Sequence, residues 1–303
     1  MAHSGLSQLL QQLEQVLLGK PRQIRLALAC ILARGHLLIE DLPGMGKTTL
    51  AHALANSLGL SYRRVQFTSD LLPGDLVGLN IFDARSQQFR FQPGPVFSQV
   101  LLADEINRAS PKTQSALLEA MEERQVSIDG ETRPLPTPFF VIATQNPLFH
   151  AGTSALPESQ LDRFMFRLSL GFPEREAEHE LLRHDSRSSR LSLLTEQLNT
   201  EQLRVLQQGV DNIVSSDALI DYLLSLVISS RHRSDMLPLS PRASKAVLRA
   251  AKAFALINER DYVTAQDVQT VFPHVAEHRL DPSSSAQDSR LSQLLLQQTP
   301  CLL

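Results

Sequence analysis

The segment from His36 to Leu50 constrains the fold of this chain more than any other part of the sequence. An apolar run ends at Glu40, a turn-forming stretch follows and a helix-like run opens, in the order Asp41-Leu42-Pro43-Gly44-Met45-Gly46-Lys47-Thr48-Thr49. A strand, a glycine-rich turn and Lys-Thr at a helix start form a cradle, because backbone N–H groups and the positive helix end face a phosphate. We therefore predict that Asp41 to Thr49 bind a nucleotide, with Lys47 reaching its β- and γ-phosphates and Thr48 ligating Mg²⁺. The alternative is a strand–turn–helix with incidental glycines, which the Gly-Lys-Thr directly after the turn disfavours.

One position departs from the usual form of this loop. The motif G-x-x-x-x-G-K-[ST] has glycine where this chain has Asp41. Aspartate is one of the few residues other than glycine that tolerate positive φ, so the turn remains possible. A carboxylate beside a bound phosphate is unfavourable unless it points away. The match to the motif is therefore strong but not complete.

Length and charge narrow the class of protein. The chain has 303 residues, long enough for two domains and a large buried core. Its net charge is −3 and its pI is near 6.3, so it lacks the overall basic footprint of a nucleic-acid-binding protein. These values disfavour a motor that moves along DNA or RNA.

Neither the N-terminus nor any apolar stretch has the pattern of a targeting or membrane segment. Residues 1–19 lack a basic region followed by an apolar one, and no stretch approaches the roughly 20 apolar residues that span a bilayer. Cys30 and Cys301 lie far apart in the sequence and indicate neither a metal site nor a disulfide framework, so a reducing compartment fits best. We expect a soluble cytoplasmic protein.

The first half of the chain alternates apolar strands with helices. Helices are predicted over 6–18 and 21–33, and buried strands over His36–Glu40, Tyr62–Phe67, Val100–Asp104 and Phe139–Thr144. Short apolar runs between helices indicate a parallel sheet covered on both faces. Two segments with alternating polar and apolar residues predict inserted β-hairpins, namely Leu79–Phe91 and Gln125–Leu135, the second turning at Asp129-Gly130. From spacing alone, both could be surface decorations.

After Phe172-Pro173 the pattern becomes helical. Helices are predicted over 174–184, 196–208, 216–233, 241–258 and 264–272, with N-caps at Ser215 or Ser216, Ser240 and Thr264. An α/β block followed by a helical block predicts two domains, over residues 1–172 and 173–280. Residues 281–303 are predicted to be a linker and a short tail.

Two further strand ends carry polar residues. Val100–Asp104 ends in the pair Asp104-Glu105, where an aspartate beside a phosphate loop can hold Mg²⁺ and a glutamate can act as general base toward water. The run Phe139–Thr144 leads to Asn146. If its strand lies beside that of Asp104, the Asn146 amide would face the γ-phosphate and could position the water. The alternatives are a solvated strand end and an Asn-Pro turn.

Three long motifs together resemble the MoxR family of AAA+ ATPases. They are the run from Leu101 to Glu123, the run Ala143-Thr144-Gln145-Asn146-Pro147 and the run from Leu156 to Phe164. The resemblance covers about residues 14 to 280 and departs from the family at Asp41 and in the tail after about residue 281. It implies a parallel-sheet P-loop AAA+ domain with inserted β-hairpins, followed by a smaller all-α lid domain.

The resemblance also implies roles for individual residues. Lys47 and Thr48 look like the Walker A pair, Asp104 and Glu105 like the Walker B pair, and Asn146 like sensor 1. Arg163, on a short helix over Glu158–Phe164, looks like an arginine finger that acts in a neighbouring subunit's site. Arg242 looks like sensor 2, which reaches the γ-phosphate from the lid. Gly19-Lys20 stands where relatives contact adenine, usually as Gly-Gln, so a contact from the Lys20 side chain is in doubt. Arg108 could face the neighbour or the pore.

The activity that the resemblance implies is hydrolysis of Mg·ATP by a homo-oligomeric ring, expected to be a hexamer, that remodels or matures a protein client. A partner with a von Willebrand factor A (VWA) domain is common in this family. Two alternatives stay open: the ATPase subunit of a magnesium-chelatase-like complex, and a regulatory adaptor with little turnover. The two hairpins match the helix-2 and pre-sensor-1 inserts of this clade.

Overall fold

A five-stranded parallel sheet forms the centre of the computed structural model, which describes residues 2–146, 156–183, 191 and 193–300. Its strand order is β2-β5-β8-β1-β9, and every neighbouring pair runs parallel. The strands are β1 (Leu37–Glu40), β2 (Tyr62–Gln66), β5 (Val100–Asp104), β8 (Phe140–Gln145) and β9 (Phe166–Leu168). The predicted α/β class and the four predicted strands are confirmed, but the burial predicted for β2 is wrong, because it is an edge strand with exposed side chains. The edge strand β9 was not predicted, because three residues are too few to show a periodic pattern.

Alternate residues of the strands enter two separate apolar cores. In β1, Leu37 and Ile39 belong to one core while Leu38 belongs to the other. The first core is covered by α1 (Ala2–Val16), α2 (Pro21–Leu32) and α3 (Lys47–Ser57), and the second by α4 (Pro73–Val77) and α5 (Pro111–Glu123). Both faces of β1, β5 and β8 are therefore buried, which explains why these three strands read as apolar runs.

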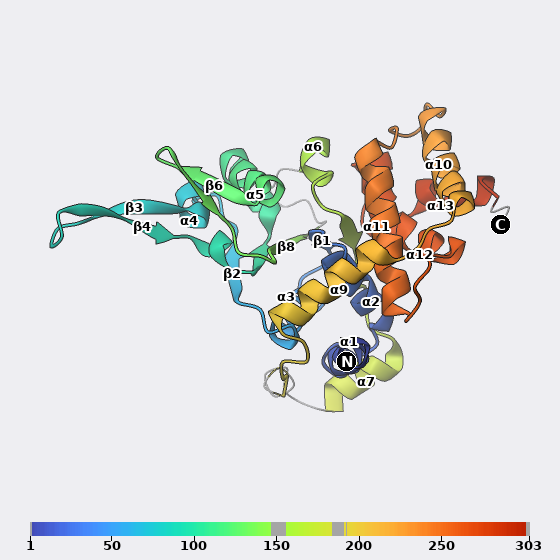
Figure 1. Ribbon diagram of the computed structural model, residues 1–303, viewed down its shortest axis with the longest axis horizontal. Coiled ribbons are helices and arrows are strands. Elements are labelled where there is room, and N and C mark those ends of the chain that lie inside the picture. Colours follow the sequence, from blue (N-terminus) through green and yellow to red (C-terminus); the bar gives the residue numbers. More distant parts are fainter. Residues whose placement is uncertain (1, 147–155, 184–190, 192, 301–303) are drawn as a thin grey trace.

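Both predicted hairpins are present. The first consists of β3 (Gly78–Asp83) and β4 (Gln88–Pro93), which project from one end of the molecule (Figure 1). The second consists of β6 (Gln125–Ile128) and β7 (Glu131–Pro134), with positive φ at both turn residues, 52° at Asp129 and 84° at Gly130. The Asn80 side chain donates a hydrogen bond of 2.7 Å to the Asp129 carboxylate, so the two hairpins are tied to each other.

The second half of the described chain is helical, and most of its helices gather at the end opposite the first hairpin (Figure 1). They are α6 (Glu158–Leu161), α7 (Arg175–Arg183), α9 (Thr200–Asn212), α10 (Asp217–Arg231), α11 (Pro241–Ile257), α12 (Ala265–Leu280) and α13 (Arg290–Gln298). The side chains of Ser216, Ser240 and Thr264 accept N-cap hydrogen bonds, as predicted. The expected end of α12 at Phe272 is wrong: the helix continues through Pro273 to Leu280, because its last turns are buried and packing outweighs the lost hydrogen bond.

The stretch predicted as a linker is fixed to the sheet. The backbone N–H of Ala286 donates to the Glu40 carboxylate at 2.8 Å, and Arg167 on β9 donates to the hydroxyl of Ser284. The predicted domain boundary at residue 172 stays a prediction. In the part of the chain that the structure describes, no helix combines the length and apolar character needed to cross a bilayer.

Candidate active site

The predicted phosphate loop lies between the carboxyl end of β1 and the first turn of α3. Gly44 and Gly46 have φ of 88° and 92°, values that favour glycine, and Gly46 is the N-cap of α3. The Lys47 ammonium donates to the backbone carbonyls of Asp41 and Gln145. Burial lowers the pKa of Lys47, and the Asp41 carboxylate acts against that shift. The loop thus presents a helix N-terminus and a lysine at one edge of the sheet.

Asp41 turns its carboxylate away from this loop. The side chain is 2% exposed and accepts hydrogen bonds from the Ser169 hydroxyl (2.7 Å) and from the backbone N–H groups of Leu170 (2.5 Å) and Gly171 (3.3 Å). Asp41 is also not among the residues with positive φ, so the tolerance of left-handed backbone that we invoked for it is not needed. The residue ties the loop to the segment after β9. Its contacts could not be predicted, because they lie about 130 positions away in the sequence.

The two acids at the end of β5 are held by the strands on either side. The Thr144 hydroxyl on β8 donates to the Asp104 carboxylate at 2.5 Å, and Arg64 on β2 pairs with its other oxygen at 2.6 Å. Glu105 follows with a φ of 56°, and its carboxylate accepts from the Gln66 amide at 2.9 Å. Residues on β2 therefore contact both acids, and no sequence pattern predicted either contact.

Arg108 and Asn146 complete this end of the sheet. Arg108, in the short 3₁₀ turn after β5, donates to the Glu105 carboxylate at 2.8 Å, and its orientation toward the neighbour or the pore stays a prediction. Asn146 directly follows β8, and β8 lies between β5 and β1, so the condition set for its predicted role is met.

The chemistry of these side chains fits a magnesium–nucleotide complex. Mg²⁺ prefers oxygen ligands and is usually bound by one or two protein oxygens together with water and phosphate. Thr48, in the first turn of α3, and Asp104, at the end of β5, supply a hydroxyl and a carboxylate of this kind. The inward turn of Asp41 removes the one carboxylate of the loop that would repel a phosphate.

Gly19 and Lys20, the two residues at the position expected to contact adenine, differ in backbone conformation and in contacts. Gly19 has a φ of 70° between α1 and α2. The Lys20 ammonium donates to the carbonyls of Gly171 (3.0 Å) and Phe172 (2.5 Å), and the side chain is buried. Lys20 is therefore engaged in holding the backbone between β9 and α7.

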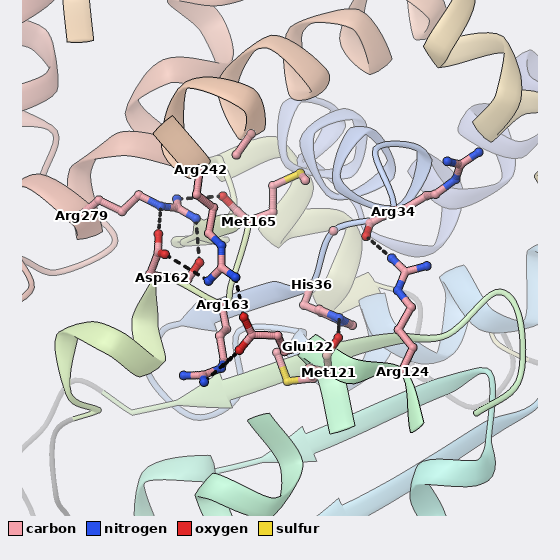
Figure 2. Close-up of a pocket in the computed structure, with 12 residues that line it drawn as sticks. Arg34, His36, Met121, Glu122, Arg124, Asp162, Arg163, Met165, Arg242 and Arg279 are labelled. Carbon is pink, nitrogen blue, oxygen red and sulfur yellow. Dashed lines mark hydrogen bonds and ion pairs between the residues drawn. The ribbon is translucent and has the colours of Figure 1, made fainter. Parts of the chain in front are cut away.

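Arg163 and Arg242 lie together, away from Lys47, beside a cavity of about 220 Å³ (Figure 2). Arg163 pairs with one oxygen of Glu122 at 2.9 Å, and Arg242 pairs with the other. Gly35 and His36, which precede β1, line the same cavity. Because the phosphate loop follows β1, the arginine pair and the loop occupy opposite ends of the sheet. The structure therefore does not bring Arg242 to the phosphate loop of its own chain.

Asp162, Arg279 and His36 fix the surroundings of the pair. Asp162 contacts Arg242 at 3.4 Å and the buried Arg279 of α12 at 2.6 Å. His36 accepts at Nδ1 from the N–H of Val141 (2.9 Å), so Nε2 donates to the carbonyl of Met121 (3.3 Å). Burial lowers the pKa of His36 to about 4.

Comparisons with known proteins agree with this architecture. The family model described as "ATPase family associated with various cellular activities (AAA)" matches residues 36–166, and the model described as "AAA lid domain" matches residues 232–298. A crystal structure from Cytophaga hutchinsonii, described as that of a candidate ATPase, has a TM-score of 0.88 and 32% identity, over 99% of this chain and 95% of that one. A full-length MCM homologue from Methanopyrus kandleri shares the fold, with a TM-score of 0.59 and 18% identity over 89% of this chain and 58% of that one.

Similar sequences cover nearly the whole chain. The uncharacterized protein YeaC of Bacillus subtilis is 45% identical, over 92% of this chain and 87% of its own length. Chaperone MoxR1 of Mycobacterium tuberculosis is 40% identical, over 89% and 74%. Protein MoxR of Methylorubrum extorquens is 30% identical, over 89% and 85%. With the AAA model matched on the sheet and the lid model on the helices, the chain belongs to the MoxR family of AAA+ ATPases.

Proposed function

We propose that this chain binds Mg·ATP at the carboxyl edge of its sheet and transfers the γ-phosphoryl group to water. Lys47 and the N–H groups of the first turn of α3 would bind the phosphates, and Thr48 and Asp104 would hold the metal. Mg²⁺, when bound, neutralises charge on the phosphate oxygens. The position of both metal-binding oxygens on adjoining strand and helix ends supports this assignment.

Glu105 is proposed as the general base and Asn146 as the group that positions the water. In the structure the Glu105 carboxylate is bound to Gln66 and Arg108, which holds it beside the end of β5. A base must lie within hydrogen-bond reach of the water, so we expect these contacts to rearrange when nucleotide binds.

We propose that hydrolysis needs a second subunit, because the arginine pair and the phosphate loop lie at opposite ends of the sheet. Arg163 and Arg242 would complete the site of a neighbour, because neither lies beside the phosphate loop of its own chain. An arginine finger supplied in this way typically contributes about 10³–10⁵ in rate. In a closed ring every chain would receive the two arginines of its neighbour, so every site would be complete. We propose a homo-hexamer.

The proposed outcome of turnover is remodelling or maturation of a protein client, assisted by a VWA-domain partner. The relative called Chaperone MoxR1 supports the first part. The β3–β4 hairpin adds to it, since it projects from the body and exposes Ile81, Phe82 and Phe89 (Figure 1).

The proposal is tested with Glu105→Gln, which keeps the shape of the side chain but removes its basicity. This variant should bind ATP normally, assemble with it and hydrolyse it at least about 10³-fold more slowly. The wild-type rate per chain should fall on dilution as the ring dissociates. A rate per chain that stays constant when the protein is monomeric would contradict a composite site. For the partner, a VWA-domain protein should co-purify with Glu105→Gln in ATP and not with Lys47→Ala.

A further inference from the structure

Glu122 lies between the two arginines that are proposed to act on a neighbouring subunit. One of its oxygens accepts from Nε and Nη2 of Arg163, at 3.0 and 2.9 Å, and the other accepts from Nη2 of Arg242. Figure 2 shows the carboxylate pointing between the two guanidinium groups. Among the described residues, it is the one carboxylate that pairs with both.

The three residues come from separate parts of the chain. Glu122 is in the last turn of α5, Arg163 follows α6, and Arg242 is in the first turn of α11. No local sequence element could keep two arginines at such positions side by side, and their like charges repel. A shared carboxylate removes that repulsion and gives both side chains a common anchor.

The contacts also fix the orientation of the Arg163 guanidinium. Its Nε and Nη2 face Glu122 while Nη1 donates to the carbonyl of Ser159 at 2.8 Å. Without Glu122, the Ser159 carbonyl would be the remaining partner of Arg163 among the described residues. The hydrogen bond from Arg242, followed by the charge of Arg163, lowers the pKa of Glu122, so the anchor stays charged near neutral pH.

We propose that Glu122 is a positioning residue that holds Arg163 and Arg242 together so that they enter the neighbour's active site as a pair. This inference rests on the proposed trans role of the two arginines. An exposed ion pair without such a role contributes little to stability and nothing to catalysis. The two cases differ in what removing the carboxylate does to turnover.

The first measurement compares Glu122→Gln with Glu123→Gln, its exposed neighbour on α5. Glu122→Gln should lower the rate of ATP hydrolysis at least tenfold and leave ATP affinity, measured in a Glu105→Gln background, within twofold of the control. Glu123→Gln should hydrolyse ATP within twofold of the wild-type rate. Equal rates for the two variants would overturn the inference.

The second measurement assigns the defect to one side of the subunit interface. A Lys47→Ala chain has no working site of its own but supplies Glu122 and both arginines, so mixing it with Glu122→Gln should restore hydrolysis. A misfolded Glu122→Gln chain could not be rescued in this way. Mixing with Arg163→Ala should restore nothing, because both chains are defective on the same side. Restoration by Arg163→Ala would overturn the inference.

A third variant separates the inference from its premise. The triple variant Glu122→Gln/Arg163→Ala/Arg242→Ala should be no slower than Arg163→Ala/Arg242→Ala, because the carboxylate acts through the two arginines. A further tenfold loss in the triple variant would overturn the positioning role and leave the proposed function intact. If Arg163→Ala were as active as wild type, the arginine finger itself would fall, and the inference with it.

Discussion

Charged side chains lie at both ends of the sheet, and they are stabilised differently at each end. At the carboxyl end, Lys47 is held by backbone carbonyls and Asp104 by residues of adjoining strands. At the amino end, Arg163 and Arg242 are neutralised by carboxylates from distant segments. In the proposed function, the first arrangement binds an anion and its metal, and the second supplies arginines to another chain. One folded chain would then carry halves of two different active sites.

The largest expected effect tests whether the carboxyl end of the sheet is the end that binds ATP. Lys47→Ala should abolish ATP binding and lower hydrolysis by at least about 10³-fold, because the ammonium that meets the phosphates is lost. Equilibrium binding of a fluorescent ATP analogue measures this directly, and Glu105→Gln serves as the contrast that still binds. Tight binding by Lys47→Ala would refute the assignment of the loop.

The amino end should affect turnover alone. Arg163→Ala is expected to bind ATP normally and to hydrolyse it at least about a hundredfold more slowly, since a trans arginine stabilises only the transition state. Steady-state turnover together with binding measures both quantities, and Arg183→Ala on the exposed side of α7 is the control. If mixing with Lys47→Ala chains restores no hydrolysis, the division of labour between the two ends is wrong.

A smaller effect concerns the aspartate that stands in the phosphate loop. Asp41→Gly restores the common form of the motif, yet we expect it to lower the free energy of unfolding by about 3 kcal/mol. The reason is that the buried N–H of Leu170 and the half-buried N–H of Gly171 lose their acceptor. Denaturant unfolding measures the loss, with the exposed Asp70→Gly as control. A glycine variant as stable as wild type would show that Asp41 is only tolerated.

The smallest expected effect is a pH dependence of stability that comes from His36, at the amino end of the sheet. His36 has a folded pKa near 4, below its ordinary 6.5, so its contribution to stability is present above pH 6.5 and is lost as pH falls toward 4. Between pH 7 and 5, unfolding free energy should fall by roughly 1–2 kcal/mol less in His36→Gln than in wild type. The exposed His179→Gln on α7 should behave like wild type, and an identical pH slope in both variants would contradict the assignment.

Sequence reasoning reached the carboxyl end because its groups are local. Asp104 and Glu105 directly follow an apolar strand, and Lys47 follows a glycine turn, so strand, turn and helix signals lie within a few residues of the chemistry. The parallel sheet then places such strand ends at one edge. Apolar patterns likewise predicted four strands and both hairpins, and Ser and Thr at helix starts predicted the caps.

The amino end was beyond such reasoning, because its contacts are between residues far apart in the chain. Glu122 and Arg242 are separated by 120 positions, and nothing around Glu122 distinguishes it from its neighbour Glu123. The motifs marked Arg163 and Arg242 as candidates, but only the fold shows that both turn toward one carboxylate. For the same reason, the role of Asp41 and the edge strand β9 emerged only from packing.

Helix α5 joins the two ends of the sheet. Near the start of α5, the Gln114 side chain donates to the carbonyls of Ile106 and Ala109, in the turn that follows Glu105. The last turn of α5 carries Glu122. The 13 residues of the helix make a rod about 20 Å long. Because a helix is stiff along its axis, a shift beside Glu105, the proposed base, would be transmitted to Arg163, the proposed finger for the next protomer. We therefore expect the sites of the proposed ring to hydrolyse ATP in sequence and not at random.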